Sequence, residues 1–233
     1  MQAWKAENAA DLAIQMRRNQ MHLYFEVAET GSLLDLPPIN VLFIRGRDML
    51  INKHYVTLFD KYVSICNIVL KKVNAEVGLK FDAKQVFDTQ RGYKRAGEDT
   101  DLIVMTFPKT LPTFRDLTKH VMEKSYLGNL PGNRIVMTFP GEPWVQKFGE
   151  VSRVAAQSYR NFENERLVAE TIISNIGSAD GDCGAAYILD EPSVQRRLVG
   201  FHYAGLKGAA CAVPLVLEDL LEVLTPIKYQ EIS

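Results

Sequence analysis

The sequence predicts an all-β protein made of two similar halves, with a helix at each end of the chain. Short runs of β-branched and aromatic residues recur along most of its length, and clusters of Gly, Pro, Asn and Asp separate these runs. Such a pattern is typical of a β-barrel or a β-sandwich. A segment rich in turn formers, "SYLGNLPGN" at 125–133, leaves enough strands on each side for a small barrel. The 233 residues suffice for one large domain or two small ones.

Helical periodicity occurs near the two ends. Residues 6–19 carry apolar side chains on one face, and Arg17 and Arg18 stand in the last turn. Residues 214–224 begin with a proline suited to a first helical turn and repeat leucine at helical spacing. We therefore expect a helix in each segment.

Apolar runs between the helices predict the strands. They lie at 21–27, 41–56 (two runs hinged at Gly46), 62–70, 101–107, 133–139, 167–176, 185–189 and 197–206. The hexapeptide "IVMTFP" occurs once in each half, at 103–108 and 135–140. The expected organisation is an N-terminal helix (1–20), a first barrel (21–124), a linker (125–133), a second barrel (134–213) and a C-terminal helix with a tail (214–233).

The composition excludes several classes of protein. Hydrophobic residues make up 47% of the chain and charged residues 24%, as in a globular protein with a sizeable core. A net charge of −1 provides no global field that would attract nucleic acid or an anionic membrane. The odd number of cysteines and the lack of a C-x-x-C pair argue against a disulfide framework. No apolar run reaches the roughly 18–20 residues of a membrane span, so a soluble, cytosolic protein is expected.

The residue best suited to nucleophilic chemistry is Cys183, within "GSADGDCGAAYIL" at 177–189. Gly181 and Gly184 permit a tight turn in which backbone N–H groups near the cysteine converge and form an oxyanion hole. By itself the segment also fits a buried strand cysteine beside a turn. Zinc ligands usually stand two to five residues apart, and no Cys or His pair here has that spacing, so no metal site is expected.

A cysteine nucleophile needs a histidine that transfers its proton and a group that orients the histidine. His54 follows an apolar run, and Asp101 opens another, with Asp99 and Glu98 as competitors. Each of these residues alone also fits a solvated charge. Together, His54, Asp101 and Cys183 follow the His–Asp–nucleophile order of chymotrypsin. Papain-like enzymes place the cysteine first, which disfavours that class.

Two motifs resemble the signature of the picornavirus 3C-like cysteine proteases, the picornains. The family pattern is G-x-C-G, a strand, and then G-x-H followed by small residues. The segment "DLIVMTFPKTLPTFRDL" at 101–117 is similar to the family's acid strand and its "FRD" turn. The divergence suggests a member related to the dicistroviruses or iflaviruses. The matching positions are Gly181, Cys183, Gly184, Gly200, His202, Ala204 and Gly205.

The resemblance implies a chymotrypsin-like double β-barrel with its active site between the barrels. It implies a viral endopeptidase that works in the host cytoplasm without a cofactor and cleaves the viral polyprotein after glutamine. Cys183 would be the nucleophile and His54 the general base and acid, with Asp101 orienting His54. Backbone N–H groups of Cys183 and of Gly181 or Asp182 would form the oxyanion hole.

The resemblance also implies a pocket for the substrate glutamine. His202 and Gly200 would line it, and His202 would donate a hydrogen bond to the glutamine carbonyl. Ser178 stands where the family usually has threonine, and its hydroxyl would contact the same glutamine amide. His202 must stay neutral, so its tautomer needs a partner. The family often has a tyrosine nine residues before the nucleophile for this role, whereas this chain has Ser174. The remaining candidates for the role are Tyr187, Tyr203 or a water.

Family members also bind viral RNA on a surface opposite the active site, around a "KFRDI"-like segment. Here "TFRDL" at 113–117 supplies Arg115, with Lys119 nearby and Arg17 and Arg18 on the N-terminal helix. The same residues fit a solvated basic face. Besides a protease, the sequence thus fits an RNA-binding module or a chymotrypsin-like domain without catalysis, and it leaves the oligomeric state open.

Overall fold

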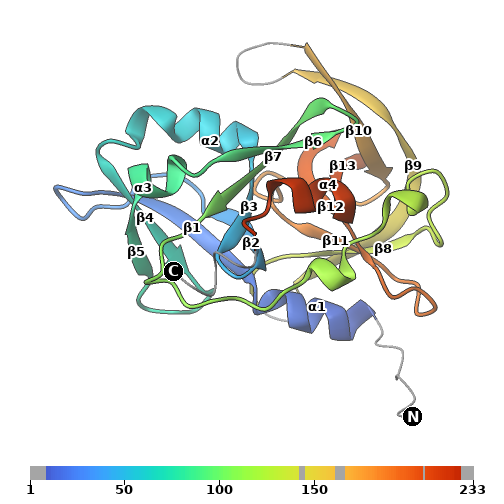
Figure 1. Cartoon of the computed structure of the whole chain (residues 1–233), viewed down its shortest axis with the longest axis horizontal. Helices are drawn as coiled ribbons and strands as arrows, with labels where there is room; N and C mark the ends of the chain where they lie inside the picture. The colour runs from blue at the N-terminus through green and yellow to red at the C-terminus, as the bar shows by residue number, and fades with distance from the viewer. Residues whose placement is uncertain (1–8, 142–144, 161–165, 207, 227–233) are drawn as a thin grey trace.

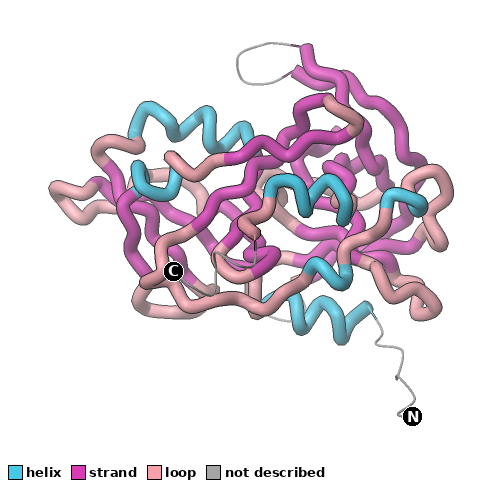
Figure 2. The backbone as a smooth tube through the Cα atoms, viewed as in Figure 1, coloured by secondary structure: helices cyan, strands magenta, loops and turns pink. Residues whose placement is uncertain are grey.

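The computed structural model describes residues 9–141, 145–160, 166–206 and 208–226 (Figure 1). Strands dominate it (Figure 2). The first half contains α1 (Ala9–Arg17), β1 (Gln20–Val27), β2 (Ile39–Arg45), β3 (Asp48–Asn52), α2 (Lys53–Phe59), β4 (Cys66–Lys71), β5 (Leu79–Asp82), α3 (Ala83–Phe87), β6 (Arg91–Arg95) and β7 (Glu98–Thr106). The second half contains β8 (Arg134–Thr138), β9 (Gln146–Arg160), β10 (Arg166–Ser174), β11 (Ala186–Leu189), β12 (Leu198–Leu206), β13 (Ala209–Pro214) and α4 (Leu217–Val223). Short 3-10 turns lie at 60–62, 118–120 and 124–126.

Each half of the chain forms its own antiparallel sheet. The first is a seven-stranded sheet in the order β5-β4-β1-β2-β3-β7-β6, and the second closes into a six-stranded barrel in the order β10-β13-β12-β11-β8-β9. The predicted hinge in the first sheet is the β2–β3 turn, where Gly46 has a φ of +57° that favours glycine. The all-β fold predicted from the sequence is confirmed.

A shared core joins the two halves. Met16 of α1, Tyr93 of β6, Phe201 of β12 and Leu220 of α4 all belong to one buried cluster. A second buried cluster packs within the first half, and a third packs within the barrel of the second half. Apolar side chains of both terminal helices therefore stabilise the boundary along which the site residues lie.

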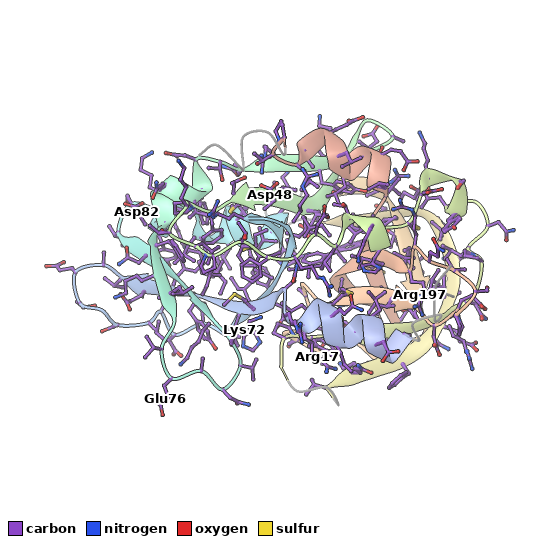
Figure 3. All side chains as sticks on the ribbon, turned by 60° about the horizontal axis from the view of Figure 1, so that its bottom comes forward. Arg17, Asp48, Lys72, Glu76, Asp82 and Arg197 are labelled. Atoms are coloured by element: carbon purple, nitrogen blue, oxygen red, sulfur yellow. The ribbon has the colours of Figure 1, made fainter. Side chains whose placement is uncertain are left out.

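The chain beyond α4 returns to the first sheet. The fully buried carboxylate of Asp48 (labelled in Figure 3) accepts hydrogen bonds from the backbone N–H of Thr225 at 2.8 Å and from its hydroxyl at 2.9 Å. Arg91 pairs with the same carboxylate at 3.1 Å. Because this charge is buried, it is stabilised by these partners rather than by water.

The structure differs from the sequence prediction at several elements. The predicted strand at 41–56 ends at Asn52, and α2 follows because Val56 and Phe59, three residues apart, are buried together on one helix face.

The prediction missed β5, β6, β9 and β13. β13 is rich in alanine, which is not a strand-forming residue, and the sequence of β9 is mainly polar. Residues 1–8 and 227–233 of the predicted end segments lie outside the described part. None of the described helices is long and apolar enough to span a bilayer.

Candidate active site

His54 and Asp101 form a tightly held pair in the first half of the chain. β3 ends at Asn52, so His54 falls in the first turn of α2, beside the neighbouring strand β7 that carries Asp101. His54 Nδ1 lies 2.6 Å from Asp101 Oδ2, and the backbone N–H of His54 donates to Asp101 Oδ1 at 2.9 Å. One carboxylate oxygen therefore orients the imidazole and the other holds the backbone of His54, so Nε2 is the ring nitrogen that would transfer protons.

The competing carboxylates lie elsewhere. Asp99 is half exposed and faces Lys53 at 3.7 Å and Lys94 at 3.5 Å. Glu98 is also exposed, at the start of β7. Asp101, two residues further along β7, is buried. Only the buried Asp101 contacts His54 among these three.

Cys183 lies in the loop between β10 and β11, facing the imidazole of His54 across the boundary between the halves. Its Sγ is 3.3 Å from the Tyr203 carbonyl oxygen. Burial lowers the pKa of His54, but hydrogen bonds to Asp101 and Cys183 and their charges raise it to about 9. This arrangement favours an imidazolium at neutral pH, and an imidazolium beside sulfur stabilises the thiolate, the reactive form of cysteine.

The turn around Cys183 requires two glycines. Gly181 and Gly184 have φ values of +91° and +88°, in the left-handed region. A Cβ on Gly184 would also overlap the carbonyl of Asn40 on β2. The sequence prediction of a glycine-dependent turn agrees with this geometry.

The amides of the same turn narrow the predicted oxyanion hole. The Asp182 N–H donates to the Ala179 carbonyl at 3.2 Å, so it is not available to a substrate. The N–H groups of Gly181 and Cys183 donate to no acceptor within the described ranges. The prediction that the Asp182 N–H could contribute to the oxyanion hole is therefore wrong. The N–H groups of Gly181 and Cys183 are the remaining candidate donors.

The side chain of Asp182 instead holds the loop from within. It is buried, lies 2.5 Å from Lys147 Nζ of β9 and accepts a hydrogen bond from the Ala179 N–H at 2.8 Å. Lys147 also donates to the Gly177 carbonyl at 3.2 Å. A buried carboxylate with a charged partner and a backbone donor is well satisfied, so the pair fixes the loop.

His202 of β12 is 1% exposed and has a partner at each ring nitrogen. Nδ1 lies 2.8 Å from Tyr187 Oη, and Nε2 lies 3.0 Å from Ser178 Oγ. Burial lowers the pKa of His202 to about 4, with smaller effects from Asp182, Lys147 and His54. The imidazole is therefore neutral at physiological pH.

Of the two tyrosines considered as partners of His202, Tyr187 is the one that contacts its ring. Its hydroxyl hydrogen-bonds Ser174, the residue at the position where the family pattern is broken, and burial raises the pKa of Tyr187, so the hydroxyl keeps its proton. Tyr203, the other candidate, instead contacts Thr171, with the two hydroxyls 2.9 Å apart. One histidine, one tyrosine and two serines thus form a connected polar chain inside the barrel.

Gly200 has a packing role in this structure. A Cβ there would lie 3.0 Å from Ala212 Cβ and 3.5 Å from Tyr187 Cβ, inside the barrel. Gly200 thus packs against Tyr187, which in turn contacts His202. Its link to the predicted glutamine pocket is therefore indirect.

Two buried asparagines connect the halves, and sequence reasoning missed both. Asn52 Nδ2 donates to the His202 carbonyl at 3.0 Å and lies within 3.5 Å of Asp101 Oδ2. Asn40 Nδ2 donates to the carbonyls of Gly181 at 2.8 Å and Cys183 at 3.0 Å. Asparagine is depleted in strands, so an Asn inside "INVLFIR" or "DMLIN" is the signal that could have identified them.

Tyr55 is a further neighbour of the nucleophile. Its ring centroid lies 4.3 Å from that of His54, and its side chain hydrogen-bonds Cys183. Burial, followed by the charge of Cys183, raises the pKa of Tyr55, so its hydroxyl remains a donor. A cavity of about 510 Å³ adjoins the loop before Cys183, lined in part by His22, Asn40 and residues 180–182. No cluster able to hold a metal ion occurs in the described ranges.

Three of the four predicted basic residues lie at or beside α1, namely Arg17, Arg18 and Arg115. Arg115 donates a hydrogen bond to a side chain of this helix at 3.2 Å, and Arg115, Arg18 and Lys119 are exposed. Lys72 donates to the carbonyl of Arg17 at 3.1 Å, and the two residues are neighbours in Figure 3. In Figure 1, α1 lies at the bottom of the molecule and α2, which carries His54, at the top.

No protein-family model matches the chain. Its sequence is similar to a segment of the replicase polyprotein of acute bee paralysis virus (strain Rothamsted), with 26% identity over 240 residues that cover 97% of this chain and 12% of the polyprotein. A shorter stretch is similar to the genome polyprotein of human hepatitis A virus genotype IA (isolate HAS-15), 26% identical over 142 residues, or 57% of this chain and 7% of that polyprotein. The chain thus spans a small fraction of these relatives.

Two solved protein structures share the fold. The HRV-C 3C protein, solved with rupintrivir, has a TM-score of 0.53 at 13% identity and covers 88% of this chain and 96% of its own. The Rv3671c protease from M. tuberculosis, in its active form, has a TM-score of 0.56 at 10% identity, with coverages of 94% and 87%. They confirm the chymotrypsin-like double-barrel fold. The chain is therefore similar in sequence to segments of picornavirus-like polyproteins and similar in fold to a 3C protein.

Proposed function

We propose that the chain is a cysteine endopeptidase that cleaves a viral polyprotein after glutamine in the host cytoplasm. One observation carries the proposal: His54 is fixed by both carboxylate oxygens of Asp101 and hydrogen-bonds Cys183. This is the arrangement of a nucleophile, its base and the residue that orients the base.

The mechanism follows from these contacts. His54 holds the proton from Cys183 as an imidazolium, and the thiolate attacks the scissile carbonyl carbon. The N–H groups of Gly181 and Cys183 donate hydrogen bonds to the oxyanion that forms. When the carbonyl re-forms, the amine leaves with the proton from His54, and a thioester remains. His54 then deprotonates a water that hydrolyses the thioester and returns the thiol.

Glutamine specificity is assigned to the polar chain around His202. A neutral imidazole whose Nδ1 accepts from the Tyr187 hydroxyl carries its proton on Nε2, where it donates to the substrate's amide carbonyl. Ser178 then turns from Nε2 to the same amide. A neutral ring does not attract the charge of a glutamate side chain. A substrate side chain without an acceptor binds more weakly, because it leaves the buried N–H of His202 without a hydrogen bond.

The test is cleavage of a peptide that spans a junction after glutamine, compared with the same peptide carrying glutamate. Wild type is expected to cut only the glutamine peptide, and Cys183→Ala neither. Equal cleavage by Cys183→Ala would contradict the assignment. A wild type that cuts neither peptide would support the alternative of a domain without catalysis.

A second candidate function is RNA binding by the basic face around α1. The contact of Arg115 with α1 favours it, because it gathers Arg115, Arg17 and Arg18 on a surface away from α2. In a titration with single-stranded RNA, Arg115→Ala should lower the slope of log affinity against log salt by about 1. Arg134→Ala, which removes an exposed arginine of β8, is the matched control. Identical slopes for both variants would exclude this face.

A further inference from the structure

Asn40 lies on β2, in the half of the molecule opposite the nucleophile, and is 5% exposed. Both hydrogens of its amide are used, on the carbonyls of Gly181 and Cys183. His22 of β1 pairs with Asn40 across the sheet, and its ring hydrogen-bonds the Asn40 side chain. A ring N–H can meet only the amide oxygen, so this contact turns the NH₂ group of Asn40 toward the loop.

These two hydrogen bonds set the direction of two peptide planes. In a trans peptide the carbonyl and the next residue's N–H point in opposite directions. Because the Gly181 and Cys183 carbonyls face Asn40, the N–H groups of Asp182 and Gly184 face away. Each of them finds a backbone carbonyl on the far side, at 3.2 Å and 3.0 Å.

The peptide between these two carries the Cys183 N–H. Its carbonyl, on Asp182, accepts from the Ala185 N–H at 3.1 Å, so the Cys183 N–H points out of the turn. The carbonyl of Asn40 also lies directly against the Cα of Gly184. Three consecutive peptides are thus fixed, and Asn40 holds the outer two.

We propose that Asn40 is a positioning residue for the oxyanion hole: its amide holds the turn so that the Cys183 N–H faces the reacting carbonyl. The proposal rests on the proposed protease function. Asn40 touches no reacting atom and acts through the two carbonyls. It also makes the oxyanion hole depend on the docking of the two halves, because the donors and their support belong to different sheets.

The experiment compares two rates in the full chain. Asn40→Leu has a similar shape, adds no charge and removes both donors. Hydrolysis of the glutamine peptide develops an oxyanion, and its kcat should fall about 100-fold, with KM changed less than about threefold. Alkylation of Cys183 by iodoacetamide forms no oxyanion and needs only the thiolate, so its rate should stay within about twofold of wild type.

Asn19→Leu is the matched control. Asn19 is 1% exposed, and its amide likewise donates to two backbone carbonyls, of Phe43 at 2.6 Å and of Arg115 at 2.7 Å. Asn19→Leu should lower the stability of the fold but leave the ratio of the peptide-hydrolysis rate to the alkylation rate unchanged. If Asn40→Leu does not fold, the same two rates are measured for Asn40→Ala, which has a smaller side chain.

A kcat close to wild type in the folded Asn40 variant overturns the proposal. So does an alkylation rate that falls in step with kcat, because that marks a general loss of structure. A wild type that does not cleave the peptide contradicts the protease function itself, which distinguishes the two failures.

Discussion

The carboxylate of Asp101 contacts His54 with both oxygens, one on the ring nitrogen at 2.6 Å and the other on the backbone N–H at 2.9 Å. The backbone contact anchors the first turn of α2 to β7, so the position of the helix and the orientation of the ring depend on the same carboxylate. Asp101→Asn keeps the shape but replaces one acceptor oxygen by a donor. We expect kcat/KM at neutral pH to fall at least about 100-fold.

Asp99→Asn is the control for this change, because Asp99 lies two residues away on β7 and forms exposed ion pairs with Lys53 and Lys94. Its kcat/KM should stay within about threefold of wild type, since exposed ion pairs contribute little. Peptide hydrolysis measures both variants, and equal losses would exclude a special role for Asp101.

Tyr187→Phe removes the hydroxyl that holds His202 Nδ1 at 2.8 Å and leaves the ring in place. The imidazole can then adopt the other tautomer, which donates nothing to the glutamine carbonyl. We expect the ratio of kcat/KM for glutamine over glutamate peptides to fall about tenfold, the value of one lost hydrogen bond. Tyr203→Phe, whose hydroxyl contacts Thr171, should leave that ratio unchanged. Equal ratios in both variants would contradict the pocket.

The pKa of His202 makes the stability depend on pH. Burial lowers this pKa from 6.5 to about 4, so the unfolded chain binds a proton more readily than the folded one between these values. Stability contributed by the neutral ring is present above pH 6.5 and is lost as the pH falls toward 4. The total is about 3 kcal/mol. In urea denaturation from pH 7 to 4, His202→Gln should lose less stability than wild type. Parallel losses would show that His202 is not buried as a neutral ring.

The two glycines of the catalytic turn should respond differently to alanine. Both have positive φ, which costs a non-glycine residue about 1–2 kcal/mol. Only Gly184 would also press a Cβ against Asn40, whereas nothing lies within 4 Å of a Cβ on Gly181. Denaturation should show the larger loss of stability for Gly184→Ala. A larger loss for Gly181→Ala would mean that the turn packs against β2 differently.

The sequence predicted those features that depend on residue types and spacings close together in the chain. The motif around Cys183, the positive-φ glycines and the terminal helices followed from spacing and turn chemistry. Asn40 and Asn52 could not be found in this way, because their amides donate to carbonyls that only the docking of the two halves brings close. Lys147 could not be found either, because its partner Asp182 is 35 residues away and comes close only when the barrel closes. For the same reason, chain order could not choose among Asp99, Glu98 and Asp101, since burial separates them.

The most direct test of Cys183 as the nucleophile is the site of a covalent label. A peptide that ends in glutamine and carries a vinyl sulfone should add to one cysteine per chain, and peptide mapping by mass spectrometry identifies it. We expect the adduct on Cys183, its loss in His54→Ala, and no adduct on the buried Cys66 and Cys211. An adduct on another cysteine, or continued peptide cleavage by a fully labelled chain, would contradict the assignment.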